Sequence, residues 1–167
     1  MRLGVPSLVI VREPAQAVAS LLVRETHLTA SAALKSYICF HRGARPHRRG
    51  FVVATFEQVT GDFGAVVERL NAAFGSDFRP FEHTDANVGR VFETMAAAGP
   101  ARIRPDQDFV VAGGWPLAER DELKRQVAEA LDDPGATGLL AEATALYEEF
   151  RTYACGIPMH VGTPECG

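Results

Sequence analysis

An arginine and a serine near the N-terminus carry the clearest chemistry in the sequence. Arg12 directly follows an apolar run, Leu8–Val11, and Pro14 favours the first turn of a helix. In open α/β sheets ligands bind beyond the carboxyl ends of the strands, and a helix N-terminus there suits a phosphate. Arg12 would add a planar two-pronged donor, and Ser20, in the second helical turn, one more hydrogen bond. The pattern predicts an anion site at Arg12 and Ser20; the alternative is a surface ion pair and a solvated serine.

Two apolar runs and the helical patterns between them set the expected fold class. The β-branched runs at residues 7–11 and 51–56 are typical of buried parallel strands. Apolar residues at helical spacing predict helices at 14–25 and 29–41, and a further helix that is capped by Thr60 and ended by Gly75. Strands that alternate with helices indicate an α/β fold with a parallel sheet flanked by helices.

The second half of the chain is expected to be rich in helix. A short helix is predicted near residues 85–95, a loop over 99–115, and two longer helices over 117–131 and 137–151. A length of 167 residues favours one domain, which we place at residues 1–152, followed by an irregular tail at 153–167. Two strands are too few for a stable doubly wound sheet, so either further strands exist or the chain is part of a larger fold.

The segment around Arg12 resembles the 3′-phosphate-binding segment of the sulfotransferase family. That family shows arginine-acidic-proline after an apolar strand and a serine eight residues past the arginine, which is the spacing of Arg12 and Ser20. The similar order continues with Tyr37 on the inner face of a helix, with the strand end Phe56-Glu57-Gln58-Val59, and with a helix that runs into residues 71–75. The resemblance covers residues 7–75 and implies a partial P-loop-type parallel sheet.

The resemblance implies transfer of a sulfuryl group from 3′-phosphoadenosine 5′-phosphosulfate to an unidentified hydroxyl or amine acceptor. Arg12 and Ser20 would hold the 3′-phosphate of this nucleotide donor, and Phe56 would lie near the adenine. Glu57 is expected to be a structural carboxylate rather than a base.

The sequence departs from the family where sulfuryl transfer is catalysed. The family binds the 5′-phosphosulfate with a P-loop-like turn and a lysine, but neither Lys35 nor Lys124 follows a glycine-rich turn. The segment that commonly carries the family's general base has no counterpart, and residues 101–104 do not match its late basic segment. We therefore expect the C-terminal portion of a sulfotransferase, incomplete at its N-terminus and without catalytic residues. The alternatives are a non-catalytic nucleotide-binding module and a protein-interaction module that forms homo-oligomers through an open sheet edge.

Composition argues against several other partner classes. The net charge of −4 argues against non-specific binding of nucleic acid, and no apolar run approaches the roughly 18 residues of a membrane span. Three widely spaced cysteines, Cys39, Cys155 and Cys166, do not suggest a disulfide framework, so we expect a cytoplasmic protein. The spacing of Cys155, His160 and Cys166 is too loose for a zinc site, and no metal is predicted.

A basic segment over residues 42–50 is expected to be a solvated loop. Its four arginines and His47 make phosphate or nucleic-acid binding the alternative. However, the segment precedes a predicted strand. It should therefore lie at the amino edge of the sheet, opposite the expected ligand edge.

Overall fold

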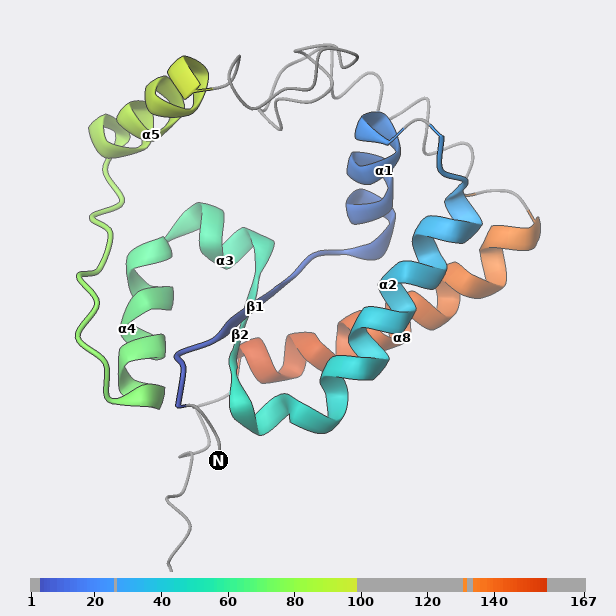
Figure 1. Ribbon diagram of the computed structural model, residues 1–167, viewed down its shortest axis with the longest axis horizontal. Coiled ribbons are helices and arrows are strands. Elements are labelled where there is room, and N and C mark those ends of the chain that lie inside the picture. The colour runs from blue at the N-terminus through green and yellow to red at the C-terminus, as the bar shows by residue number, and fades with distance from the viewer. Residues whose placement is uncertain (1–3, 26, 99–130, 132–133, 156–167) are drawn as a thin grey trace, which may run out of the picture. The chain divides into compact units, whose positions relative to one another are not determined.

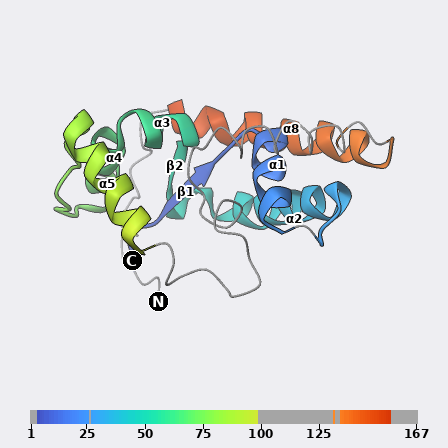
Figure 2. The ribbon, with the colours of Figure 1, turned by 90° about the horizontal axis from the view of Figure 1, so that it is seen from above.

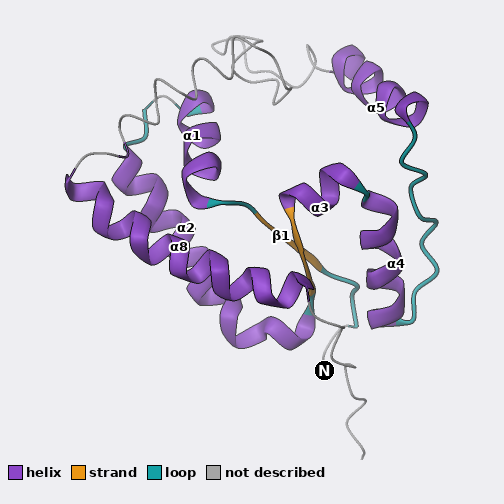
Figure 3. Ribbon diagram, turned by 180° about the vertical axis from the view of Figure 1, so that it is seen from behind, coloured by secondary structure: helices purple, strands orange, loops and turns teal. Residues whose placement is uncertain are grey.

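The computed structural model describes residues 4–25, 27–98, 131 and 134–155. Within these ranges the protein is helix-rich with one small parallel sheet, so the expected mixed α/β class is confirmed (Figures 1 and 3). The chain divides into two compact units. Unit 1 holds the described residues within Met1–Arg12, Phe40–His83 and Ala145–Gly167, and unit 2 holds those within Glu13–Cys39 and Thr84–Thr144.

Strands β1 (Leu8–Val11) and β2 (Val52–Thr55) form the parallel sheet of unit 1 and lie side by side in Figures 1 and 2. The register pairs Val11 with Thr55, so both strands end at the same edge of the sheet. Every residue of β2 is buried, which explains the apolar run Val52–Ala54. β1 is less buried than its sequence predicts, since Ile10 is 48% exposed, and its only strand partner among the described residues is β2.

Helix α3 (Phe56–Gly61) follows β2 directly and begins with a capping box. The Thr55 hydroxyl accepts a hydrogen bond from the Gln58 N–H at 3.2 Å, and the Gln58 side chain accepts one from the Thr55 N–H at 3.0 Å. Thr60, predicted to cap the following helix, lies inside α3, where its hydroxyl donates to the carbonyl of Phe56 at 3.0 Å. The prediction of a cap at Thr60 is therefore wrong.

Asp62 is the N-cap residue of helix α4 (Phe63–Phe74), and its carboxylate accepts a hydrogen bond from the Ala65 N–H at 3.1 Å. The predicted end at Gly75 is confirmed, and this glycine adopts the left-handed conformation, with φ of 63°. Both α3 and α4 contact β2. The apolar face of α4 is partly buried: Val66 and Val67 are buried, and Phe63, Leu70 and Phe74 are half-buried.

The chain beyond α4 is held close to that helix by the side chain of Asn71. Its amide nitrogen donates to the Phe78 carbonyl at 2.7 Å, and its amide oxygen accepts from the Phe78 N–H at 3.0 Å. Gly64 permits the close approach, because a Cβ at this position would collide with the backbone carbonyl oxygen of Phe81. The glycine in the first turn of α4 is therefore a packing requirement.

Unit 2 is mainly helical in its described residues. It contains α1 (Pro14–Arg24) and α5 (Asp85–Ala98), together with α2 (Ala30–Ala44) as far as Cys39 and α8 (Pro134–Cys155) as far as Thr144. These four helices were predicted, although α2, α5 and α8 extend beyond the expected ends. α8 includes residues 153–155 of the predicted tail. The remaining tail, the loop predicted at 99–115 and residues 117–130 of the helix predicted over 117–131 lie outside the described residues.

The basic segment over residues 42–50 is helical rather than the expected loop. α2 continues to Ala44, and a 3₁₀ helix, η1 (Arg45–Gly50), follows it. Pro46 fits the first turn of η1, where a backbone N–H would have no partner within the helix. Every residue of η1 is exposed, so the expected contact with solvent is confirmed.

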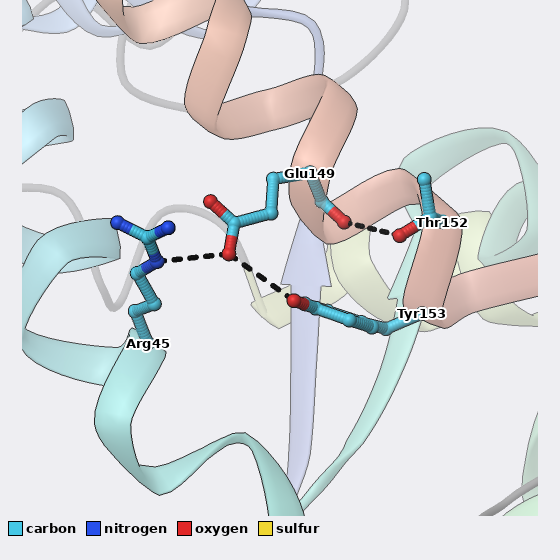
Figure 4. A network of polar contacts seen from close by, with 4 residues as sticks. All are labelled: Arg45, Glu149, Thr152 and Tyr153. Carbon is cyan, nitrogen blue, oxygen red and sulfur yellow. Dashed lines mark hydrogen bonds and ion pairs between the residues drawn. The ribbon is translucent and has the colours of Figure 1, made fainter.

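Contacts with the C-terminal turns of α8 fix η1 within unit 1 (Figure 4). Arg45 Nε donates to Glu149 Oε1 at 2.9 Å, and the Tyr153 hydroxyl donates to the same carboxylate oxygen at 3.1 Å. The guanidinium carbon of Arg48 lies 5.7 Å from the centroid of the Tyr153 ring. Partners 104 residues away in the sequence therefore help to order η1.

The phenol of Tyr153 makes the stability of unit 1 depend on pH. Burial and the hydrogen bond to Glu149 raise the pKa of Tyr153 above its ordinary value of 10.0. A raised folded-state pKa stabilises the fold fully below the unfolded pKa, and this contribution is lost as the pH rises through the folded pKa. We expect the free energy of unfolding to fall more steeply above a pH of about 10 in the wild-type protein than in Tyr153→Phe. Urea unfolding across this pH range measures both slopes, and equal slopes would contradict the prediction.

Candidate functional site

The carboxyl edge of the sheet carries an arginine stacked on an aromatic ring. Arg12 follows the last residue of β1 and Phe56 follows the last residue of β2, and the parallel register brings them together. The guanidinium carbon of Arg12 lies 4.1 Å from the centroid of the Phe56 ring, and both residues are half-buried. A guanidinium is a planar fork of N–H donors that matches phosphate oxygens. The edge where open α/β sheets bind ligands therefore holds an ordered cation within unit 1.

The N-terminus of α1 is occupied by a side chain of its own sequence. The Glu13 carboxylate accepts hydrogen bonds from the Ala15 N–H at 3.0 Å and from the Gln16 N–H at 2.8 Å. A carboxylate at this position also offsets the positive end of the helix dipole. The prediction that these backbone groups are open to a phosphate is therefore wrong, and anion binding at the sheet edge has to rely on side chains such as Arg12.

The second predicted site residue, Ser20, belongs to unit 2. It lies in the middle of α1 and is half-buried. Arg12 belongs to unit 1. The joint role of Arg12 and Ser20 in binding a phosphate stays a prediction from the sequence.

Two other residues on which the sequence resemblance rests, Glu57 and Tyr37, lie on helices α3 and α2. Glu57 is exposed in the first turn of α3, where a negative charge stabilises the helix N-terminus, in agreement with a structural role. Tyr37 is half-buried on α2 in unit 2.

Metal ligation has no candidate in the part of the chain that the structure describes. No group of three or more histidine, cysteine, aspartate or glutamate side chains gathers there. Cys39 and Cys155 are exposed free thiols, whereas His160 and Cys166 lie outside the described residues.

Among the helices that the structure describes, none has both the length and the apolar character that crossing a bilayer requires.

Arg69 on α4 is a positioning residue that the sequence patterns did not single out. Its guanidinium donates to the carbonyl of Val53 in β2 and to the carbonyl of Ala154 in α8, the latter at 3.0 Å. Gln58 also donates to the Ala154 carbonyl, at 3.3 Å. Burial lowers the pKa of Arg69, but a guanidinium remains charged at neutral pH. The signal in the sequence that could have identified Arg69 was an arginine three residues after Val66 and next to Leu70, on the apolar side of this helix.

Comparison with known proteins adds no relative. No family model, no curated protein and no solved structure matches the chain.

Proposed function

We propose that this chain binds a 3′-phosphorylated adenosine nucleotide at the carboxyl edge of its sheet, as the nucleotide-binding part of a sulfotransferase-like protein with a partial P-loop-type fold. The contact between Arg12 and Phe56, at 4.1 Å, is the observation that supports this most directly. Arg12 would bind the 3′-phosphate through two parallel hydrogen bonds, since arginine and phosphate match in geometry and charge. Phe56 would add apolar surface beside the adenine.

Ser20 enters the proposed function through the sequence resemblance. Its hydroxyl, eight residues past Arg12, would donate one hydrogen bond to the same phosphate. A Ser20→Ala variant tests this role separately from that of Arg12.

In the complete reaction, the sulfuryl group of 3′-phosphoadenosine 5′-phosphosulfate passes to an unidentified hydroxyl or amine acceptor. The bond between sulfur and the bridging phosphate oxygen breaks, and the acceptor forms a bond to sulfur and loses its proton. Adenosine 3′,5′-bisphosphate is the leaving group. Stabilisation of the charge on that bridging oxygen is normally the largest catalytic contribution. Because no lysine follows a glycine-rich turn in this sequence, we assign nucleotide binding to Arg12, Ser20 and Phe56 and name no catalytic residue.

The exposed thiols of Cys39 and Cys155 suit a reducing compartment, so we place the protein in the cytoplasm.

Adenosine 3′,5′-bisphosphate is expected to raise the melting temperature of the wild-type protein. A ligand that binds only the folded state stabilises it by RT ln(1 + [L]/Kd), so the shift should grow with ligand concentration. Adenosine 5′-monophosphate, which lacks the 3′-phosphate, should raise the melting temperature much less. Arg12→Ala should lower the affinity for the bisphosphate about 10- to 100-fold, because hydrogen bonds to charged groups contribute about 1.5–3 kcal/mol.

A matched arginine separates this site from a general effect of charge. The Arg79 side chain is 90% exposed and belongs to unit 1, so Arg79→Ala should leave the shift intact. A shift that survives Arg12→Ala, or that is lost equally in Arg79→Ala, would show that the site is wrong.

A protein-interaction module is the second candidate. Among the described residues β1 pairs only with β2, so its other side is an open strand edge, and the Ile10 side chain of this strand is 48% exposed. Such a module would form homo-oligomers through that edge. Dimers in sedimentation experiments, together with no nucleotide-induced change in melting temperature, would favour this function.

A further inference from the structure

The basic segment (residues 42–50) concentrates positive charge in an acidic protein. It holds four arginines and His47, whereas the whole chain has a net charge of −4. All five of these side chains belong to unit 1 and are exposed. Because the segment leads into the first residue of β2, it lies at the amino end of that strand, whereas Arg12 and Phe56 lie at the carboxyl edge. The basic segment is therefore separate from the proposed nucleotide site.

The basic segment already binds one carboxylate within unit 1. Glu149 Oε1 accepts hydrogen bonds from Arg45 Nε at 2.9 Å and from the Tyr153 hydroxyl at 3.1 Å (Figure 4). Arg48 lies over the ring of Tyr153, which restricts its guanidinium. These contacts tie η1 to α8, so its backbone and the side chains of Arg45 and Arg48 need little further ordering to bind a partner.

Two further side chains of the segment are available for recognition. Among the described residues, Arg49 and His47 make no hydrogen bond or ion pair, and both are exposed. Together with Arg48 they lie in the last turn of η1. A guanidinium pairs with a carboxylate through two parallel hydrogen bonds, as it does with a phosphate.

We propose that the basic segment is a docking surface for a segment of a partner protein that is rich in aspartate and glutamate. Arg45 of this segment already pairs with the carboxylate of Glu149, and the other guanidinium groups suit carboxylates equally well. A short acidic segment would contact only the local positive charge. A nucleic acid would also meet the acidic remainder of the chain, whose net charge repels long polyanions.

The probe is a fluorescein-labelled peptide of alternating glutamate and glycine, and its counterpart has glutamine in place of glutamate. Fluorescence anisotropy with the full chain should show binding of the acidic peptide that weakens as salt is added, and little binding of the glutamine peptide. The double variant Arg48→Gln and Arg49→Gln should weaken binding by at least about tenfold. The control, Arg79→Gln and Arg90→Gln, removes the same charge from exposed sites elsewhere and should bind as the wild type does.

Neither Arg48 nor Arg49 belongs to the nucleotide site, so the double variant should keep the melting shift with adenosine 3′,5′-bisphosphate. This readout separates failure of the docking surface from failure of the nucleotide site. Absence of peptide binding at low salt, or equal weakening in the control variant, would overturn the proposal. Tighter binding of a single-stranded oligonucleotide or of phosphatidylserine vesicles, lost in Arg48→Gln and Arg49→Gln, would overturn the assignment to an acidic protein.

Discussion

Replacement of Phe150 by alanine is expected to lower the free energy of unfolding by about 3–5 kcal/mol. Phe150 of α8 is 0% exposed, and its ring meets His41 and Tyr153 edge-on, with centroid distances of 5.0 and 6.0 Å. Alanine would remove the buried ring, lose both aromatic contacts and leave a cavity in unit 1. Urea unfolding followed by circular dichroism should show a lower midpoint with an unchanged slope.

Two matched substitutions show whether the buried volume of Phe150 is the cause. Phe150→Leu keeps most of that volume and should cost clearly less than Phe150→Ala. Phe78 belongs to the same unit but is 50% exposed, so Phe78→Ala should change stability by about 0.5 kcal/mol or less. A loss in Phe150→Ala no larger than the loss in Phe78→Ala would contradict the assignment of Phe150 to the core.

The second large loss of stability is expected for Arg69→Met. Methionine has a similar length but no donors, so the carbonyls of Val53 and Ala154 would each lose a charged hydrogen-bond partner. A partly buried acceptor left without a partner costs about 1–3 kcal/mol. The Ala154 carbonyl keeps the hydrogen bond from Gln58, so we expect a total loss of about 1–3 kcal/mol. The urea midpoints of the wild-type and Arg69→Met proteins measure this difference.

Arg69→Lys and Arg151→Met are the controls for Arg69. Lysine keeps the charge but not the planar fork, so it should serve one carbonyl rather than two and give an intermediate loss. Arg151 pairs with Glu148 on the exposed face of α8, where an ion pair contributes little, and Arg151→Met should leave the midpoint almost unchanged. If all three variants unfold at the same urea concentration, Arg69 does not link β2 to α8.

The two proposed binding surfaces of unit 1 use the two ends of β2. Phe56, with Arg12 stacked on it, follows the carboxyl end of the strand, and η1 precedes its amino end. Arg69 holds the middle of the same strand through Val53. We therefore expect Arg69→Met to reduce both nucleotide and peptide binding through loss of fold, whereas Arg12→Ala and the Arg48 and Arg49 variants should each affect one surface.

Local sequence patterns are enough to predict those parts of the protein that depend on neighbours along the chain. Apolar periodicity located the strands and most helices, because a residue's environment repeats with the geometry of its own element. Gly75 marked the end of α4, because only glycine reaches φ of 63° without strain. The position of Arg12 beyond a strand and before a helix also followed from local sequence. Thr60 failed as a cap because Thr55 and Asp62 supply both helix starts.

The pairs of side chains that meet across the fold could not be predicted from the sequence. Arg12 lies on Phe56, 44 positions away, because β1 and β2 pair in parallel with Val11 opposite Thr55. Arg45 reaches Glu149 across 104 residues, and this contact helps η1 to be a helix where a basic loop was expected. Contacts of this kind depend on the path of the chain between the partners. Local propensity holds no information about that path.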